Sequence, residues 1–236
     1  SQLAMALGAG ETTLMKMVTA YAMIDNSGRR VDPTLIDRIQ DRYGKTIYKH
    51  DKRDCATCMS PVWSPGLPEP ELLDVNDQVM NPYTAYQITS MMEGVVQRGT
   101  GKKVLAVGKP VAGKTGTSNE ERDAWFIGFT PDLVVGTYVG FDNPKPMGKG
   151  RTGGELVAPI VADFMSLALK DKPATPFRVP RAIELIPIDA KSGKRGIFGQ
   201  PGVILEAFKP GDEPPDSTKI IGEGAITVAG AASDGG

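Results

Sequence analysis

The chain has 236 residues, 40% of them hydrophobic, and a formal net charge of -1. A chain of this length can bury a sizeable core. The nearly balanced charge argues against a general nucleic-acid binder, which needs a clustered surplus of Lys and Arg to contact phosphates. The sequence has no apolar run long enough to cross a membrane and no basic segment leading into an apolar one at its start. We therefore expect the chain as given to be soluble.

The first predicted element is a helix over residues 12–24, with a Thr N-cap and Gly28 as its stop signal. Its apolar residues recur every three or four positions, as a core-facing stripe requires. They are Leu14, Met17, Val18, Tyr21 and Ile24. A turn at Gly44 then joins two short β-like runs, which predicts a small surface hairpin.

Residues 49–80 are charged and then Pro-rich, and they form a predicted loop insertion that contains Cys55 and Cys58. A C-x-x-C pair can be a disulfide, a redox centre or half of a zinc site. We expect no metal site, because His50, the only histidine, supplies at most one further ligand. A local disulfide in an oxidising compartment is the preferred interpretation, and two free thiols are the alternative.

A second helix is predicted to open at Asn81-Pro82, where an N-cap residue precedes a proline, and to stop in the segment 98–101. Three antiparallel strands follow, at approximately 111–118, 124–130 and 133–141. The first two read as a β-hairpin, approached by the apolar run 104–107. The glycine pair around Thr100 is expected to shape a rim beside the strand that carries Lys114.

The glycine-rich loop 148–154 leads into a predicted helix over residues 156–169. This helix is expected to cover one face of the sheet. Its covering residues are expected to be Ile160, Val161, Phe164 and Leu167. A few short strands are predicted within residues 178–208, and the Gly-, Ala- and Pro-rich composition of residues 209–236 predicts a disordered tail.

Residues 108–115 formally satisfy the phosphate-loop pattern, in which a glycine and four residues precede Gly-Lys-Thr. A phosphate loop requires a helix directly after the lysine, because the N–H groups of that helix hold the phosphate. The residues that follow Lys114 instead predict a strand and a turn. This sequel argues against nucleotide binding.

The competing interpretation is a strand edge that binds an acyl substrate. Gly116 would let the substrate backbone lie close, Thr115 and Thr117 could donate hydrogen bonds to a carboxylate, and Lys114 supplies positive charge. The backbone N–H of Thr117 could form half of an oxyanion hole. This interpretation predicts a serine acyl-enzyme. The alternative is a glycine-containing strand with a surface lysine.

The run GKTGTSNEERDAWFIGFTPDLVVGTYVGFDN, residues 113–143, resembles the transpeptidase domain of the class A penicillin-binding proteins, which are bifunctional peptidoglycan synthases. The segments TTLMKMVTAYAMIDNSGRRVDPTLI and NPYTAYQITSMMEGVVQRGTG resemble the same family. The similarity covers roughly residues 4–200. The motifs are specific in combination, far more than Lys-Thr-Gly alone.

The resemblance implies an α/β (α+β) fold of the penicillin-binding protein and β-lactamase type, a five-stranded antiparallel sheet flanked by helices. The family's nucleophile lies in Ser-x-x-Lys, followed by Ser-x-Asn, and none of the ten serines of this chain fits either pattern. Both patterns precede the first helix in the family. Residues 1–208 are therefore expected to be the C-terminal part of a transpeptidase domain that lacks the part bearing the nucleophile.

Carried over by position, Lys114, Thr115, Gly116 and Thr117 would bind and orient the substrate, with the Thr117 N–H in the oxyanion hole. The implied reaction attacks the D-Ala-D-Ala end of a peptidoglycan stem peptide, releases the terminal D-Ala and passes the acyl group to a neighbouring amine. β-Lactams would acylate the same serine. No cofactor is implied. The close rivals are a D-Ala-D-Ala carboxypeptidase, a β-lactamase, or a non-catalytic module of the same fold.

The resemblance also implies a setting. The enzyme would act at the outer face of the cytoplasmic membrane, in the periplasm where an outer membrane exists, and this location suits a Cys55–Cys58 disulfide. The missing N-terminal part would supply a membrane anchor, a glycosyltransferase region and the Ser-x-x-Lys segment. The isolated chain is expected to be inactive.

Overall fold

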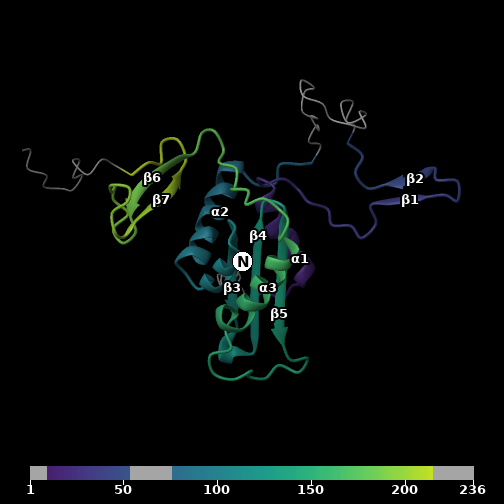
Figure 1. Cartoon of the computed structure of the whole chain (residues 1–236), viewed down its shortest axis with the longest axis horizontal. Coiled ribbons are helices and arrows are strands. Elements are labelled where there is room, and N and C mark those ends of the chain that lie inside the picture. The colour runs from purple at the N-terminus through teal and green to yellow at the C-terminus, as the bar shows by residue number, and fades with distance from the viewer. Residues whose placement is uncertain (1–9, 54–75, 215–236) are drawn as a thin grey trace, which may run out of the picture. The chain divides into compact units, whose positions relative to one another are not determined.

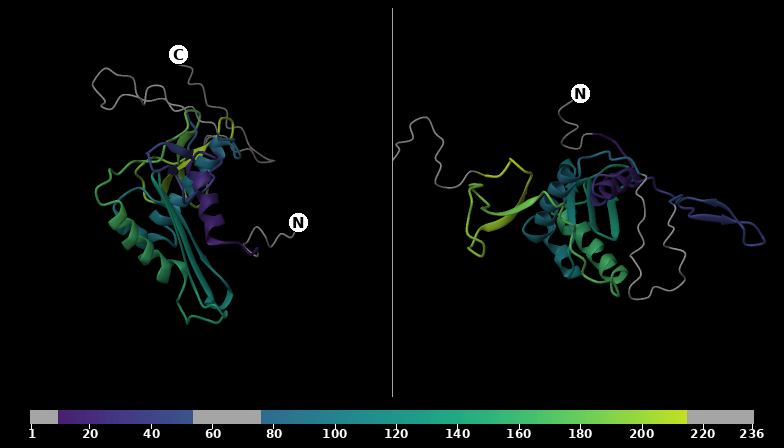
Figure 2. Two further views of the ribbon diagram at one scale, coloured as in Figure 1. Left: turned by 90° about the vertical axis from the view of Figure 1, so that its right-hand side faces the viewer. Right: turned by 90° about the horizontal axis from the view of Figure 1, so that it is seen from above.

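The computed structural model describes residues 10–53 and 76–214. Cys55, Cys58, most of the predicted insertion at 49–80 and most of the predicted tail lie outside these residues. The chain divides into two compact units, residues 1–180 and 181–236. The elements of the first unit are shown in Figures 1 and 2. In the part of the chain that is described, no helix is long and apolar enough to cross a membrane.

A three-stranded antiparallel sheet lies at the centre of the first unit. Its strands are β3 (Ala112–Thr117), β4 (Asp123–Thr130) and β5 (Leu133–Gly140), in the order β3-β4-β5. The three predicted strands are confirmed. The apolar approach is not part of the hairpin, because residues 102–107 form the 3₁₀ helix η3 (Lys102–Val107), which ends at Gly108 in the left-handed conformation.

Helix α1 (Leu14–Asp25) lies on one face of the sheet, as the left panel of Figure 2 shows. The predicted cap is confirmed, since the Thr13 hydroxyl accepts a hydrogen bond from the Lys16 N–H at 3.2 Å. A Cβ on Gly136 of β5 would come within 2.4 Å of a methyl group of Val18. The missing side chain at Gly136 therefore lets α1 approach the sheet closely. The five apolar side chains predicted to face the core from α1 are each half-buried.

Helix α2 (Pro82–Gln97) begins as predicted, with the Asn81 side chain accepting hydrogen bonds from the first turn. It contacts β3. The ring of Phe126 in β4 is fully buried. Ideal Cβ atoms on Gly113 and Gly128 would lie only 2.7 and 2.6 Å from that ring. The two glycines thus leave the space that the central aromatic ring of the core fills.

Helix α3 (Ala158–Ala168) covers the opposite face of the sheet from α1 (Figure 2), and a short π-helical turn, η5 (Gly153–Val157), leads into it. The helix was expected, but its predicted covering face was largely wrong. Val161 is buried, whereas Ile160, Phe164 and Leu167 are exposed. The buried face consists of Ala158, Val161, Ala162, Met165 and, just after the helix, Leu169. Because apolar residues lie all round this helix, periodicity alone does not select the buried side.

The predicted surface hairpin is present as β1 (Arg38–Gln40) and β2 (Thr46–Lys49), with Gly44 at a φ of 82° in the turn. In the second unit, β6 (Glu184–Asp189) pairs with β7 (Val203–Phe208). These two are the short strands that the sequence predicted within residues 178–208. Ile183, Ile186, Ile188 and Ala207 are buried in this unit.

Asp25, the last residue of α1, provides a pH test of this packing. Burial, with a smaller contribution from the neighbouring charge of Asp132, raises the pKa of its carboxyl to about 7. Because this pKa is higher in the folded state than in the unfolded state, the folded state loses stability as the pH rises from about 4 to 7. We expect Asp25→Asn to raise the melting temperature more at pH 8 than at pH 5. An equal change at both pH values would contradict the raised pKa.

Candidate active site

Strand β3 is an edge strand within the described residues, and its outer side carries the residues singled out from the sequence. The Ser118 N–H donates to the Asp123 carbonyl oxygen, so these two residues form a hydrogen-bonded pair. In an antiparallel ladder every second pair is hydrogen-bonded, and Gly116 with Trp125 is the next such pair. The backbone N–H and C=O groups of Thr115 and Thr117 consequently point away from β4. A peptide could therefore pair with this edge.

Lys114 is exposed, and its ammonium group donates a hydrogen bond to the Thr115 carbonyl oxygen at 2.6 Å. That carbonyl belongs to the outward set, so the positive charge lies at the free edge of the strand. The hydroxyl oxygen of the half-buried Thr115 lies 2.6 Å from that of Thr100, and either hydroxyl can be the donor. Thr100 stands in the predicted glycine-flanked rim beside this strand.

Thr117 is exposed at the end of β3, and its hydroxyl accepts a hydrogen bond from the Gly153 N–H at 3.1 Å. The donor is the first residue of η5. The hydroxyl proton of Thr117 stays available for donation. The structure thus brings Lys114, Thr115, Gly116 and Thr117 together along one edge.

Gly153 and Gly154 are buried and lie against the motif strand. A Cβ on Gly153 would come within 2.6 Å of the Gly116 carbonyl oxygen and 2.3 Å of the Trp125 carbonyl oxygen. A Cβ on Gly154 would lie 2.4 Å from the Thr100 carbonyl oxygen. Sequence reasoning treated this stretch only as a glycine-rich loop. Two consecutive glycines opening a helix were the signal that could have identified a close backbone contact.

An aromatic pair lies on the α1 side of the sheet, next to Gly116. The rings of Trp125 and Tyr138 are 4.7 Å apart, and the Tyr138 hydroxyl donates to the Asp123 carboxylate at 2.7 Å. This hydrogen bond raises the pKa of Tyr138. The pair places two aromatic rings and one hydroxyl group beside the end of β3, and Tyr138 is partly exposed to solvent.

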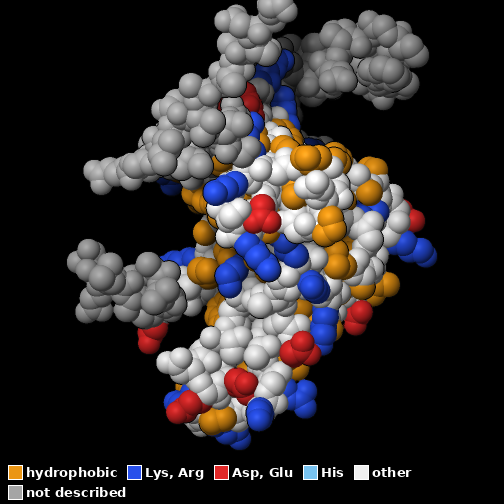
Figure 3. Space-filling model, turned by 90° about the vertical axis from the view of Figure 1, so that its left-hand side faces the viewer, with side chains coloured by type: hydrophobic (Ala, Val, Ile, Leu, Met, Phe, Trp, Pro, Cys, Tyr) orange, Lys and Arg blue, Asp and Glu red, His pale blue; other side chains and the backbone are white. Residues whose placement is uncertain are grey.

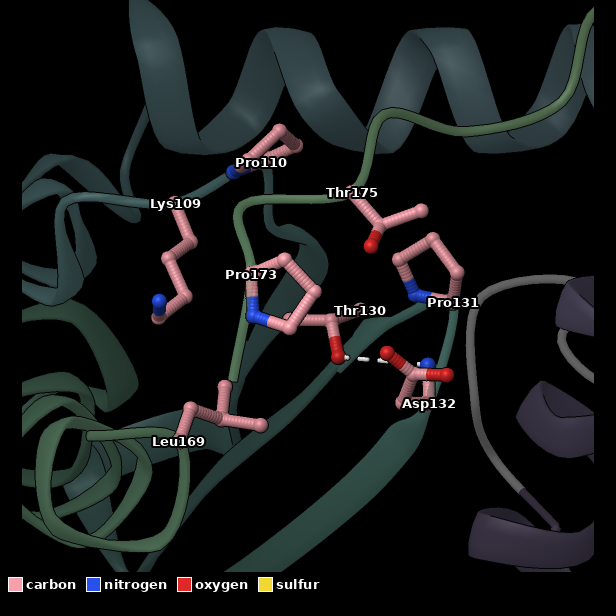
Figure 4. Close-up of a pocket in the computed structure, with 8 residues that line it drawn as sticks. All are labelled: Lys109, Pro110, Thr130, Pro131, Asp132, Leu169, Pro173 and Thr175. Atoms are coloured by element: carbon pink, nitrogen blue, oxygen red, sulfur yellow. Dashed lines mark hydrogen bonds between the residues drawn. The ribbon is translucent and has the colours of Figure 1, made fainter. Parts of the chain in front are cut away.

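The hollow drawn in Figure 4 lies at the other end of the sheet. It is lined by Lys109, Pro110, Thr130, Pro131, Asp132, Leu169, Pro173 and Thr175. Lys109 donates to the Lys172 carbonyl oxygen at 2.5 Å, so its ammonium is already engaged. The hollow adjoins the start of β3, whereas Thr117 is at the end of that strand. It is therefore separate from the motif edge.

Charges on the surface are unevenly distributed despite the balanced total. On the face drawn in Figure 3, several Lys and Arg side chains gather near the middle, and the lower end carries acidic and basic side chains together. Among the described residues, no three His, Cys, Asp or Glu side chains are grouped to hold a metal ion. The phosphate-loop reading also fails, because Lys114 lies inside a strand and not before a helix.

Gly153→Ala tests the close contact between η5 and β3. The added methyl group would press on two backbone oxygens that cannot move independently of the sheet. We expect the free energy of unfolding to fall by about 2 kcal/mol or more. Gly94→Ala is the matched control, since its methyl group would meet only the flexible end of Arg98 and a helix favours alanine. Equal effects in the two variants, measured by denaturant unfolding, would contradict the contact.

Comparison with known proteins shows which family the chain resembles. A family model described as the penicillin binding protein transpeptidase domain matches residues 1–166. Penicillin-binding protein 1A of Rickettsia conorii is 46% identical over 209 residues, which are 87% of this chain and 26% of that protein. Penicillin-binding protein 1A of Neisseria gonorrhoeae is 35% identical over 231 residues, 96% of this chain and 26% of that protein.

The same fold occurs in a solved structure. The crystal structure of penicillin-binding protein 1A from Haemophilus influenzae superposes with a TM-score of 0.71 at 27% identity, covering 90% of this chain and 34% of that one. The chain thus spans about a quarter of the length of the curated relatives. The expected fold of helices around an antiparallel sheet is confirmed, and the central sheet contains three of the five expected strands within the described residues. On the evidence of the family model and these relatives, the chain belongs to the penicillin-binding protein transpeptidase domain family.

Proposed function

We propose that this chain is the strand-bearing part of a serine D,D-transpeptidase that cross-links peptidoglycan stem peptides. The donor is the D-Ala-D-Ala end of one stem peptide, and the acceptor is an amine of a neighbouring one. β-Lactams, which carry a reactive carbonyl beside a carboxylate, would acylate the same serine. The reaction needs no metal or organic cofactor. The serine and its lysine lie outside this chain, which contains no Ser-x-x-Lys sequence.

The observation that carries the proposal is the free edge of β3 at Lys114–Thr117. The outward N–H and C=O groups of this edge suit pairing with an extended peptide, and Gly116 leaves room for it. The outward N–H of Thr117 suits one half of an oxyanion hole, where preorganised donors contribute most to acyl transfer. Lys114 places a positive charge at the same edge, where the terminal carboxylate of the donor would lie.

Two alternatives to the transpeptidase use the same site. One differs in the group that accepts the acyl chain, and the other lacks the nucleophilic serine. Water as the acceptor would give a D-Ala-D-Ala carboxypeptidase or a β-lactamase. Loss of the serine would leave a non-catalytic binding module. The transpeptidase is favoured, because the family match extends through residues 1–166 and the relatives matched over most of the chain are penicillin-binding proteins.

The proposed enzyme works at the outer face of the cytoplasmic membrane, where its substrate is assembled. The rest of the polypeptide would supply the membrane anchor, the nucleophile and a glycosyltransferase region. An oxidising compartment would permit a disulfide between Cys55 and Cys58, which lie outside the described residues.

Lys114→Ala in the complete protein tests the site. We expect acylation by a fluorescent penicillin to slow by about a hundredfold, because the variant loses a charge contact to the carboxylate. Lys45→Ala, an exposed lysine in the turn of the β1–β2 hairpin, is the matched control and should leave the rate unchanged. Melting temperatures of both variants report whether the fold is intact. If Lys114→Ala is acylated as fast as the parent protein, Lys114 does not belong to the site.

The isolated chain tests the placement of the nucleophile. We expect incubation with the fluorescent penicillin to leave it unlabelled, whereas the complete protein is labelled in a one-to-one ratio. Peptide mapping of the labelled complete protein should identify a serine outside this chain. A stoichiometric label on a serine of this chain, Ser118 for example, would refute the assignment.

A further inference from the structure

The hydroxyl groups of Thr100 and Thr115 form a hydrogen-bonded pair. Thr115 has a proposed role in binding the substrate, whereas Thr100 has none so far. The two hydroxyl oxygens are 2.6 Å apart, a short distance for two neutral hydroxyls. Thr100 follows α2 and Thr115 lies in β3, so the contact joins two elements that are separate in the sequence. The ammonium of Lys114 is held at the backbone carbonyl oxygen of Thr115, the residue that carries one of the two hydroxyls.

Thr100 is held firmly by backbone contacts on both sides. The N–H groups of Gly99 and Gly101 both donate to the Val95 carbonyl oxygen, at 3.1 and 2.9 Å. Gly154 presses on the Thr100 carbonyl oxygen from η5, where a Cβ would come within 2.4 Å. The backbone position of Thr100 is thus fixed by the end of α2 and by the same turn that contacts β3.

Counting protons shows what the pair can offer a ligand. Each hydroxyl has one proton, and the bond between them uses one of the two. Within the described residues, neither hydroxyl makes another hydrogen bond. One proton is therefore left to donate. When Thr100 donates to Thr115, the remaining proton belongs to Thr115, on the strand that the substrate would pair with.

We propose that Thr100 is a positioning residue that orients the Thr115 hydroxyl toward the carboxylate of the bound donor peptide or β-lactam. This inference rests on the proposed transpeptidase function. Without the Thr100 oxygen, the Thr115 hydroxyl rotates freely, and its proton is no longer directed at the carboxylate. The ligand group is a carboxylate, because Lys114 supplies a positive charge at the Thr115 carbonyl and the hydroxyl pair supplies a hydrogen-bond donor on the same residue.

The test compares Thr100→Val and Thr100→Ser in the complete protein. Valine keeps the shape and removes the hydroxyl, whereas serine keeps the hydroxyl. We expect Thr100→Val to slow acylation by a fluorescent penicillin about tenfold and Thr100→Ser to recover most of the rate. Thr46→Val, the same change on an exposed residue of β2, is the control and should leave the rate at the parental value.

Two further readouts separate positioning from a general structural effect. The first readout compares kcat/KM for two substrates, a D-Ala thioester that ends in a carboxylate and the same thioester with a C-terminal amide. The preference for the carboxylate substrate, given by the ratio of the two kcat/KM values, should fall about tenfold in Thr100→Val. In a double-mutant cycle, Thr100→Val should add little to Thr115→Val, since Thr100 acts through Thr115. An unchanged ratio, or full additivity, would overturn the positioning role.

The outcome for the parent protein separates this inference from the proposed function. If the parent is acylated and Thr100→Val reacts at the parental rate, only the role of Thr100 fails. If the parent complete protein is not acylated by penicillin at all, the proposed function fails and the role of Thr100 fails with it.

Discussion

The close contact between the Gly153–Gly154 turn and the end of β3 is the constraint on which the candidate site depends. Side chains at these two positions would collide with backbone oxygens of Gly116, Trp125 and Thr100. The contact therefore holds three separate segments together: the end of α2, the motif strand and the start of η5. From this arrangement follow the hydrogen bond from Gly153 to Thr117 and the pairing of the Thr100 and Thr115 hydroxyls.

The two faces of the sheet have different surroundings. On one face, Phe126 and the buried side of α3 form a core that fixes β3 in place. On the other, α1 covers the upper part of the strands, and Trp125 and Tyr138 line the part beside Gly116. A rigid strand with an unpaired edge suits the proposed acyl transfer, because preorganised donors need no rearrangement as charge develops.

Local signals in the sequence predicted much of this fold. Thr13 and Asn81 cap their helices through their own side chains, and the turns flanking β4 follow directly from the residues between the strands. The candidate motif residues were singled out from the sequence, since Gly, Lys and Thr in one strand are chemically unusual, and the structure places them on the edge strand β3. The contacts of Gly153 and the buried side of α3 were not predicted, because both depend on segments distant in the sequence.

The most direct test of the account is the structure of the complete protein acylated by a β-lactam. We expect the acyl carbonyl oxygen to accept a hydrogen bond from the Thr117 N–H at about 3 Å and the ligand carboxylate to lie beside Lys114 and Thr115. An acyl group bound away from the outer edge of β3, or a carboxylate directed away from these residues, would contradict it.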